Sequence, residues 1–304
     1  MYKNMLVTLD GSELAEVVLS YATELSQRLH LNLVFINVCE TKQAESLPMC
    51  RAYMKYATET VMSPLRNKTD VNTENHNQVR WEVVTGDPAE EILKYADKNN
   101  IDLILMANHG HSGLKSLVIG SVANKVLHAS KVPIWLVRAC VPEEVIYDKR
   151  PIRTVLVPLD GSKRAESVLP HVASLVKQRG ADLVEVTLLK ICEEPFITSD
   201  YPEGGSELTW DEHIKRMKER VRELARQYLN KIEKQLTSSG IKVNSEVLFG
   251  EPSEEIINYA NNNQVNLIMM ATHAYSRLGQ LTSDSVADKV SHRASSPLFL
   301  VRSV

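Results

Sequence analysis

A chain of 304 residues is long enough for two domains that each bury a core without disulfide or metal support. Its net charge of -3 gives no electrostatic reason to expect nucleic acid or a membrane surface as a partner. None of the four cysteines belongs to a CxxC pair or has a histidine at zinc spacing. No apolar run approaches the roughly 18 residues of a membrane span, and the opening MYKNMLVTLDGS does not resemble a signal peptide. We therefore expect a protein of the reducing cytoplasm.

The first half of the chain predicts alternating strands and helices. Apolar runs predict strands at 4–9, 31–38, 78–84, 101–107 and 133–138. Apolar residues at helical spacing behind a Ser12 cap predict a first helix, and further helices are expected within 45–62 and at 88–98 and 120–129. The strands are rich in Val, Ile and Leu without clean alternation, which is typical of a parallel sheet covered on both faces. The order of elements favours a doubly wound α/β layer.

The chain is written twice. MLVTLDGSELAEVVL at Met5 reappears as VLVPLDGSKRAESVL at Val155, so Asp10 corresponds to Asp160. VVTGDPAEEILKYADKNNIDLILMANH reappears as VLFGEPSEEIINYANNNQVNLIMMATH, and VPIWLVR reappears as SPLFLVR. Such a repeat predicts two tandem α/β domains, each a doubly wound, Rossmann-like parallel sheet of five strands. We place them at 1–145 and 150–304, with the boundary in the polar segment 141–150.

The second copy departs from the first in its helices and in an inserted segment. Pro170 lies well inside the expected first helix and should kink it, because proline removes a backbone hydrogen bond. Segment 193–210 reads as a loop, and a strongly charged helix is expected at 211–236, either as a solvated face or as a partner-binding helix. Its inward-facing residues are expected to be Ile214, Met217, Val221 and Leu224.

Two loops contain the residues that suit a ligand. Ligands of open α/β sheets bind beyond the carboxyl ends of the strands, where the winding direction reverses. The loop after strand one contains Asp10, whose carboxylate suits an amino group such as that of adenine. The loop after strand four contains Gly110 and leads to Gly120 and Ser121 at a helix start, where free N–H groups suit phosphates. Together they indicate a nucleotide, although Asp10 alone fits a helix cap or an Asp-Gly turn equally well.

Other phosphate-binding motifs do not fit. GHSGLKS superficially resembles a Walker A loop, but Leu114 stands where that motif needs glycine, and no GxGxxG follows strand one. The LDGS turns, the TGDP and FGEP segments, the NHGxxG loop, GSVANKVL and PIWLV instead resemble the universal stress protein family in its tandem two-domain form. The resemblance covers both copies almost end to end.

The resemblance implies an ATP site in the first copy. Nucleotide-binding members carry Gly, two residues, Gly, nine residues, Gly and Ser or Thr, and only the first element departs here, as Ala107. Weakened binding is therefore expected. By resemblance Asp10 contacts adenine and Val38 lines its pocket, whereas ribose and phosphates are held by Gly110, Gly120, Ser121 and the backbone of Val122. Any metal is expected to be magnesium arriving with the phosphates.

Catalysis is not indicated by the residues of either copy. His109 flanks Gly110 and belongs to the candidate site, but its counterpart His273 in the second copy favours a structural hydrogen bond. No Ser-His-Asp order or paired carboxylate converges on the loops, and nothing specifies a water-activating base, so slow ATP hydrolysis is the most the family resemblance implies. In the second copy Ala271, Ala274 and Asp284 replace the family's glycines, and a carboxylate repels phosphate.

Three functions are therefore compared. The first is a nucleotide-binding, stress-response regulatory protein with ATP in the first domain only. The second is a nucleotide-independent assembly protein with both sites vestigial, which Ala107 favours. The third is an α/β enzyme that uses the nucleotide as substrate, such as an adenylyl-transfer relative.

The last strand of each copy is expected at a sheet edge. Unpaired backbone groups and the large side chains of Trp135 and Phe299 favour a partner there. Members of the resembled family commonly dimerise through this strand. We expect 134–137 to pack against 298–301 within the chain, and a homodimer stays open.

Overall fold

The computed structural model describes residues 2–39, 46–68, 78–108, 119–138, 153–195, 209–273 and 285–303. The first half contains β1 (Asn4–Thr8), α1 (Val17–Leu29), β2 (Asn32–Cys39), α2 (Leu47–Lys68), β3 (Val79–Thr85), α3 (Pro88–Lys98), β4 (Leu103–Ala107), α4 (Ser121–Ala129) and β5 (Ile134–Val137). The second half contains β6 (Arg153–Pro158), α6 (Lys163–Glu166), α7 (Leu169–Arg179), the 3-10 turn η2 (Ala181–Leu183), β7 (Val184–Cys192), α8 (Trp210–Thr237), β8 (Lys242–Phe249), α9 (Pro252–Asn262), β9 (Leu267–His273), α10 (Val286–Arg293) and β10 (Leu298–Ser303).

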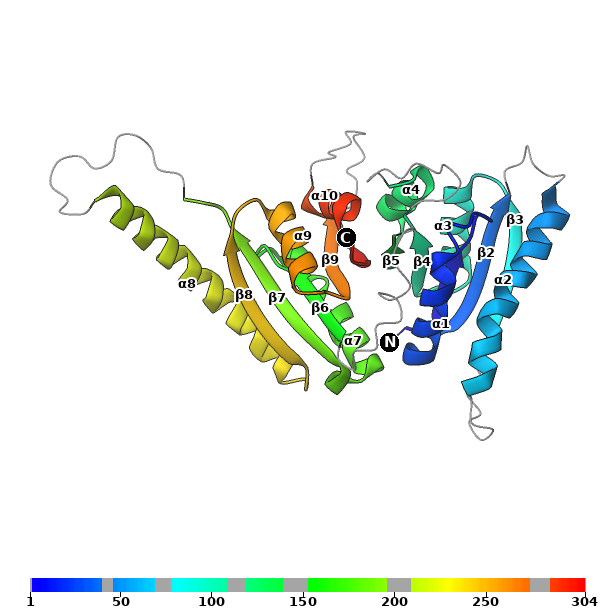
Figure 1. Ribbon diagram of the computed structural model, residues 1–304, viewed down its shortest axis with the longest axis horizontal. Coiled ribbons are helices and arrows are strands. Elements are labelled where there is room, and N and C mark those ends of the chain that lie inside the picture. Colours follow the sequence, from blue (N-terminus) through cyan, green and yellow to red (C-terminus); the bar gives the residue numbers. More distant parts are fainter. Residues whose placement is uncertain are drawn as a thin grey trace.

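The strands form one sheet in the order β3-β2-β1-β4-β5-β10-β9-β6-β7-β8. The four strand pairs within each half are parallel, and β5 pairs with β10 in antiparallel fashion at the centre. The predicted α/β class is confirmed, and the two five-stranded layers are continuous with one another (Figure 1). Because β1 neighbours β4 in parallel, the loops that follow these two strands leave the same edge of the sheet.

Helices cover both faces of the sheet. One buried cluster joins α1, α2, α7 and α8 to the strands, and a second joins α3, α4, α9 and α10 to the opposite face. Successive β1 residues divide between them, since Met5 and Val7 belong to the first cluster and Leu6 to the second. This two-sided burial explains why the strand sequences lack a polar alternation.

The predicted pairing of the last strands is confirmed. Phe299 lies opposite Trp135 in the register, and their rings meet edge to face with centroids 5.8 Å apart. Two arginines add matching contacts beside the strands: Arg138 donates to the carbonyls of His292 and Ala294, and Arg302 donates to that of Ala129 at 3.1 Å. The joint between the halves is therefore closed by backbone, aromatic and charged groups.

Two predictions about the second half were wrong. Pro170 does not kink one helix, because the chain breaks into α6 and α7 and the proline takes the first turn of α7, where its missing N–H has no cost. Leu224 on α8 is 59% exposed, whereas the fully buried residues of that helix lie further along it, at Ala225, Leu229, Ile232 and Leu236. The expected loop 193–210 lies largely outside the described residues. Among the residues that are described, no helix is long and apolar enough to cross a membrane.

Candidate functional site

Asp10 lies two residues beyond the end of β1, in an exposed turn. The backbone N–H and hydroxyl of Ser12 donate to its Oδ1 at 2.9 and 2.6 Å, and Gly11 between them has a φ of +83°. Only glycine adopts that conformation without strain. The Asp-Gly turn is thus formed, and it keeps the carboxylate in place at the surface, where a ligand can reach it.

Val38 and Ala107 lie at the same edge of the sheet as Asp10. Val38 is the penultimate residue of β2 and Ala107 is the last residue of β4, and both are half-buried. Positive φ among the described non-glycine residues occurs at His30, Asn100 and Gln264, so Ala107 is extended. The position does not require glycine for its backbone conformation, and alanine there carries no strain.

The start of α4 is fixed directly beyond β4. The N–H of Gly120 donates to the carbonyl of Asn108 at 2.7 Å, and the N–H of Asn108 donates to that of Val137 at 2.8 Å. These bonds tie the helix start to the ends of β4 and β5. Gly120 has a φ of -60°, which any residue can adopt, so a glycine is useful here for close approach and not for backbone conformation.

The N–H groups that open α4 are available for an anion. The first bond inside the helix runs from the N–H of Asn124 to the carbonyl of Gly120 at 2.9 Å, which leaves the preceding N–H groups without intrahelical acceptors. Gly120 has no side chain with which to cap them, and Ser121 is exposed. The structure brings Asp10, Val38, Ala107, Gly120, Ser121 and Val122 to one edge, whereas His109 and Gly110 lie outside the described residues.

A contact that the sequence analysis missed holds α4 against α3. Asp87 caps α3 by accepting from the N–H groups of Ala89 and Glu90 at 3.0 and 3.1 Å. Its second oxygen lies 3.4 Å from Nζ of Lys125 on α4. The hydrogen bond from Glu90 N–H, with help from Lys125, lowers the pKa of the Asp87 carboxyl. The TGDP segment could have indicated the cap in advance, because it places Asp87 directly before the proline that begins α3.

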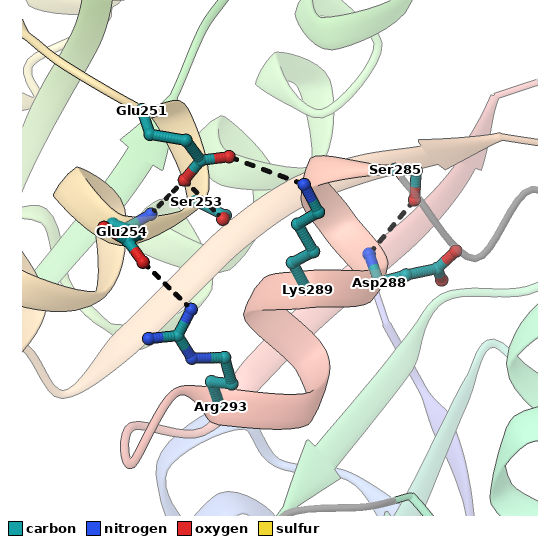
Figure 2. A network of polar contacts seen from close by, with 7 residues as sticks. All are labelled: Glu251, Ser253, Glu254, Ser285, Asp288, Lys289 and Arg293. Atoms are coloured by element: carbon teal, nitrogen blue, oxygen red, sulfur yellow. Dashed lines mark hydrogen bonds and ion pairs between the residues drawn. The ribbon is translucent and has the colours of Figure 1, made fainter.

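The second half repeats the tie and changes the helix start (Figure 2). Glu251 caps α9 by accepting from the N–H of Glu254 at 2.8 Å, and it lies 3.7 Å from Nζ of Lys289 on α10. At the start of α10, however, the Ser285 hydroxyl accepts from the N–H of Asp288 at 3.1 Å. The helix that corresponds to α4 therefore caps itself with its own serine.

A lysine also changes the turn after β6. Lys190 donates from Nζ to the carbonyl of Asp160 at 2.7 Å and lies 3.4 Å from where a Gly161 side chain would begin. Burial acts to raise the pKa of the Asp160 carboxyl, but the hydrogen bonds from Ser162 together with the positive charge of Lys190 lower it. In the first half the same place on the second strand is held by Asn37, which is buried and donates to the Leu9 carbonyl at 2.9 Å.

The start of α4 also contacts the second half. The N–H of Ile119 donates to Nδ1 of His292 on α10 at 3.3 Å. On the same surface Nε2 of His128 lies 3.7 Å from Asp288, and burial lowers the pKa of His128 more than Asp288 raises it. Ile119, the residue before Gly120, is thus hydrogen-bonded directly to the second half of the chain. Among the described residues no cluster of three or more metal-ligating side chains occurs.

The ten-stranded sheet, built from two five-stranded parallel halves, defines a tandem pair of Rossmann-like α/β domains. The family model described as "Universal stress protein family" matches residues 1–138 and 151–302. The chain belongs to this family, in its tandem two-domain form. Nucleotide binding is typical of the family.

Individual relatives match either one half or the whole chain. Universal stress protein MJ0577 of Methanocaldococcus jannaschii is 27% identical over 155 residues, which are 45% of this chain and 96% of that protein. Universal stress protein YxiE of Bacillus subtilis is 28% identical over 150 residues, which are 45% of this chain and 100% of that protein. The crystal structure of a universal stress protein from Archaeoglobus fulgidus DSM 4304 covers 98% of both chains with a TM-score of 0.64 and 21% identity, which is a likeness of fold.

Proposed function

We propose that this chain is an ATP-binding regulatory protein of the stress response and that it takes the nucleotide in its N-terminal half only. The observation that carries the proposal is the difference between the two helix starts. The opening N–H groups of α4 follow a glycine at the edge of the sheet, whereas an N–H group of α10 is already taken by Ser285. A nucleoside phosphate needs such donors, and a serine hydroxyl competes with it for them.

In this proposal the phosphates lie over the start of α4. The backbone N–H groups of Ser121 and Val122 and the Ser121 hydroxyl donate to phosphate oxygens, Gly120 lets the chain approach closely, and magnesium arrives with the phosphates. His109 and Gly110 belong to the preceding loop. The adenine lies across the edge, with its amino group donating to Asp10 and its ring against Val38. Ala107 is extended and leaves the backbone at the strand end accessible.

The C-terminal half offers less at each of these places. Its aspartate forms the same turn with a serine, but the ammonium of Lys190 donates to the Asp160 carbonyl in that turn. Its helix start is capped, and in the sequence Asp284 precedes Ser285 where Gly120 precedes Ser121. A carboxylate at that place repels a phosphate. This half is proposed to serve the tandem assembly, with domains of 1–145 and 150–304.

Regulation follows from the contact between α4 and α10. A ligand changes the balance of two conformations only if it binds them with different affinities. A phosphate bound at Ser121 pulls on the helix start, and the adjacent Ile119 N–H is bonded to His292 of the other half. Nucleotide binding thereby changes the strength of the contact between α4 and α10. A partner protein that binds across this contact would distinguish the ATP-bound chain from the free one.

The test is a calorimetric titration of the full chain with ATP and magnesium. One ATP per chain is expected, and Gly120→Asp, which copies the second half, should reduce binding by at least about 100-fold through like-charge repulsion. Ser285→Ala serves as a matched control, because it alters the other helix start and should leave the stoichiometry at one. Two sites per chain, or full binding by the Gly120→Asp variant, would contradict the proposal.

One observation favours a second function. Ala107 stands where the nucleotide-binding pattern has its first glycine, and the joint between the halves is extensively built. A nucleotide-independent assembly protein would show both features. The same titration separates the two, because an assembly protein gives no heat with ATP and no change with Gly120→Asp.

A further inference from the structure

Two cysteine side chains meet where α2 begins beside the end of β2. Cys39 is the last residue of β2 and is 3% exposed, whereas Cys50 lies in the first turn of α2 and is half-buried. Their Sγ atoms are 2.7 Å apart. Non-bonded carbon atoms prefer a separation of about 3.5 to 4.0 Å, and sulfur is larger than carbon. The two thiols are therefore in closer contact than ordinary side-chain packing gives.

The backbone around the two thiols already suits a bond between them. A disulfide bond is about 2.05 Å long, so the two sulfur atoms have to move by well under an ångström to form one. The sheet fixes the position of Cys39, because the N–H of Gly86 on the neighbouring strand donates to its carbonyl at 3.1 Å. Oδ1 of Asn37 accepts from the Cys39 thiol at 3.4 Å. Neither the strand nor the helix has to shift before the sulfur atoms can join.

The second half of the chain has one of these cysteines without the other. Cys192 ends β7 as Cys39 ends β2, and it is also buried. Helix α8, which follows β7 as α2 follows β2, contains no cysteine. A buried cysteine at this strand end is thus shared by the two halves and fits a packing role. The second thiol, which makes disulfide chemistry available, is particular to the first half.

We propose that Cys39 and Cys50 are a modification site, at which a reversible disulfide forms when the chain meets a hydroperoxide. In the first step the Cys50 sulfur attacks the peroxide and is oxidised to a sulfenic acid. The O–O bond breaks, and the thiol proton ends on the departing water or alcohol. In the second step the Cys39 sulfur attacks the Cys50 sulfur, the S–O bond breaks, and the Cys39 proton leaves with the hydroxide as water. Two electrons pass from the two thiols to one peroxide.

The order of the two steps follows from exposure. Cys50 is the sulfur that solvent reaches, whereas Cys39 is buried beneath it. Burial, and next the hydrogen bond to Cys50, raises the pKa of Cys39 to about 11, so that this thiol keeps its proton at neutral pH. A protonated, buried thiol reacts slowly with an oxidant in solution, but it is in contact with the sulfur that has been oxidised.

The disulfide joins the start of α2 to the end of β2 and closes the chain segment 40–49 into a loop. In a reducing compartment such bonds are transient, because cellular dithiols return the two electrons. The bond lies next to Val38, at the edge of the sheet that contains the candidate nucleotide site. Its formation does not depend on nucleotide, so this inference stands or falls separately from the proposed function.

The first experiment treats the full chain with hydrogen peroxide and maps its cysteines by mass spectrometry. The four thiols should fall to two, because one disulfide consumes two of them. Tryptic cleavage after Lys42 and Arg51 separates Cys39 from Cys50, so that their disulfide appears as two linked peptides. Cys192→Ser, the matched control, should give the same linked peptides. Four remaining thiols in the wild type, a link to any other cysteine, or a link between two chains would overturn the proposal.

The second experiment tests the order of the steps. With Cys39→Ser, the reaction should stop at a sulfenic acid on Cys50, which dimedone traps. With Cys50→Ser, the Cys39 thiol should be lost at least about 10-fold more slowly than the Cys50 thiol of the first variant, because it is buried. Faster oxidation of Cys39 than of Cys50 would contradict the proposed order.

The third experiment measures what the disulfide does to the wild-type chain. Hydrogen exchange of the amides in the first turns of α2 should slow by at least about threefold after oxidation, because the helix start is then joined to the sheet. Dithiothreitol should restore the original exchange. Helix α8 serves as the internal control, since it contains no cysteine and should exchange equally in both states. Equal exchange of α2 before and after oxidation would show that the bond does not hold the helix start.

Discussion

The starts of α4 and α10 occupy the same place in two copies of one fold, and they differ in what they leave exposed. Both helices are held by a lysine against the capping acid of the preceding helix, at 3.4 Å for Lys125 and Asp87 and at 3.7 Å for Lys289 and Glu251. Only α10 is capped by its own serine. The fold and the lysine–acid contacts that support the helix are thus shared by the two halves. The capacity to bind an anion depends instead on the residues at the helix start.

The turn after the first strand of each half shows the same division. Asp10 and Asp160 both accept from the backbone N–H of a serine two residues on, so the turn itself is preserved. The neighbouring strand supplies a buried amide, Asn37, in one half and an ammonium, Lys190, in the other. A single change on β7 therefore places a positive charge beside the turn of the second half, where the first half has a neutral amide.

The largest expected difference concerns the two aspartates. Asp10→Ala should weaken ATP binding by about 10- to 100-fold, because a hydrogen bond to a charged group contributes about 1.5 to 3 kcal/mol. It should also reduce the preference for ATP over GTP. Asp160→Ala should leave ATP binding unchanged. Calorimetric titrations of both variants check this, and equal losses of affinity would show that the two halves share the nucleotide.

The two helix-start serines should give opposite results. Ser121→Ala removes a proposed phosphate contact and should weaken ATP binding by about 10-fold, with little effect on the free energy of unfolding. Ser285→Ala removes a helix cap and should lower the free energy of unfolding by about 1 kcal/mol, with no effect on ATP. Urea unfolding and titration of both variants provide the comparison. A stability loss at Ser121 equal to that at Ser285 would mean that the two starts are alike.

The sequence was sufficient for the fold because repeats and apolar periods report directly on buried faces. The pairing of Trp135 with Phe299 followed from large apolar side chains on an unpaired edge. Leu224 was misassigned because Leu224 and Ala225 both lie about one turn after Val221, and the buried face of the helix continues through Ala225. Pro170 was misassigned because the break that precedes α7 moved the proline from a helix interior to a first turn.

The candidate site was predictable only in part. Motif spacing identified Gly120 and Ser121, and the strand order then placed them beside Asp10. The roles of Lys190 and His292 depend on contacts between segments far apart in the chain, which no local pattern reveals.

The capping acids should behave alike in the two halves. Asp87→Ala and Glu251→Ala should each lower the free energy of unfolding by about 1 kcal/mol at pH 7. Both carboxyls have pKa values below their ordinary ones, through hydrogen bonds from Glu90 N–H and from Ser253 respectively. Their contribution is therefore present above about pH 4 to 4.5 and is lost as the pH falls through the lowered values. Unfolding curves at pH 7 and at pH 2.5 should show the variants converging on the wild type, and a difference that persists in acid would assign the loss to packing.

The smallest expected effect tests whether the second half acts on the first. His292→Ala removes the acceptor of the Ile119 N–H next to Gly120 and should weaken ATP binding by about three- to fivefold, since one neutral hydrogen bond contributes about 1 kcal/mol. His292→Asn should restore binding, because its side-chain oxygen can take the place of Nδ1. His128→Ala is the comparison variant, because it removes the contact with Asp288 between the same two helices and leaves the acceptor of the Ile119 N–H in place.

A coupling between the halves must also act in the reverse direction, because linkage of binding equilibria is reciprocal. If His292 supports the α4 start when ATP binds, then ATP must strengthen the joint between α4 and α10 by the same factor. Hydrogen exchange of the α10 amides, measured with and without ATP, should therefore slow by about three- to fivefold in the wild type and not in His292→Ala. Equal protection in both proteins would limit the second half to assembly and leave the nucleotide site of the first half acting alone.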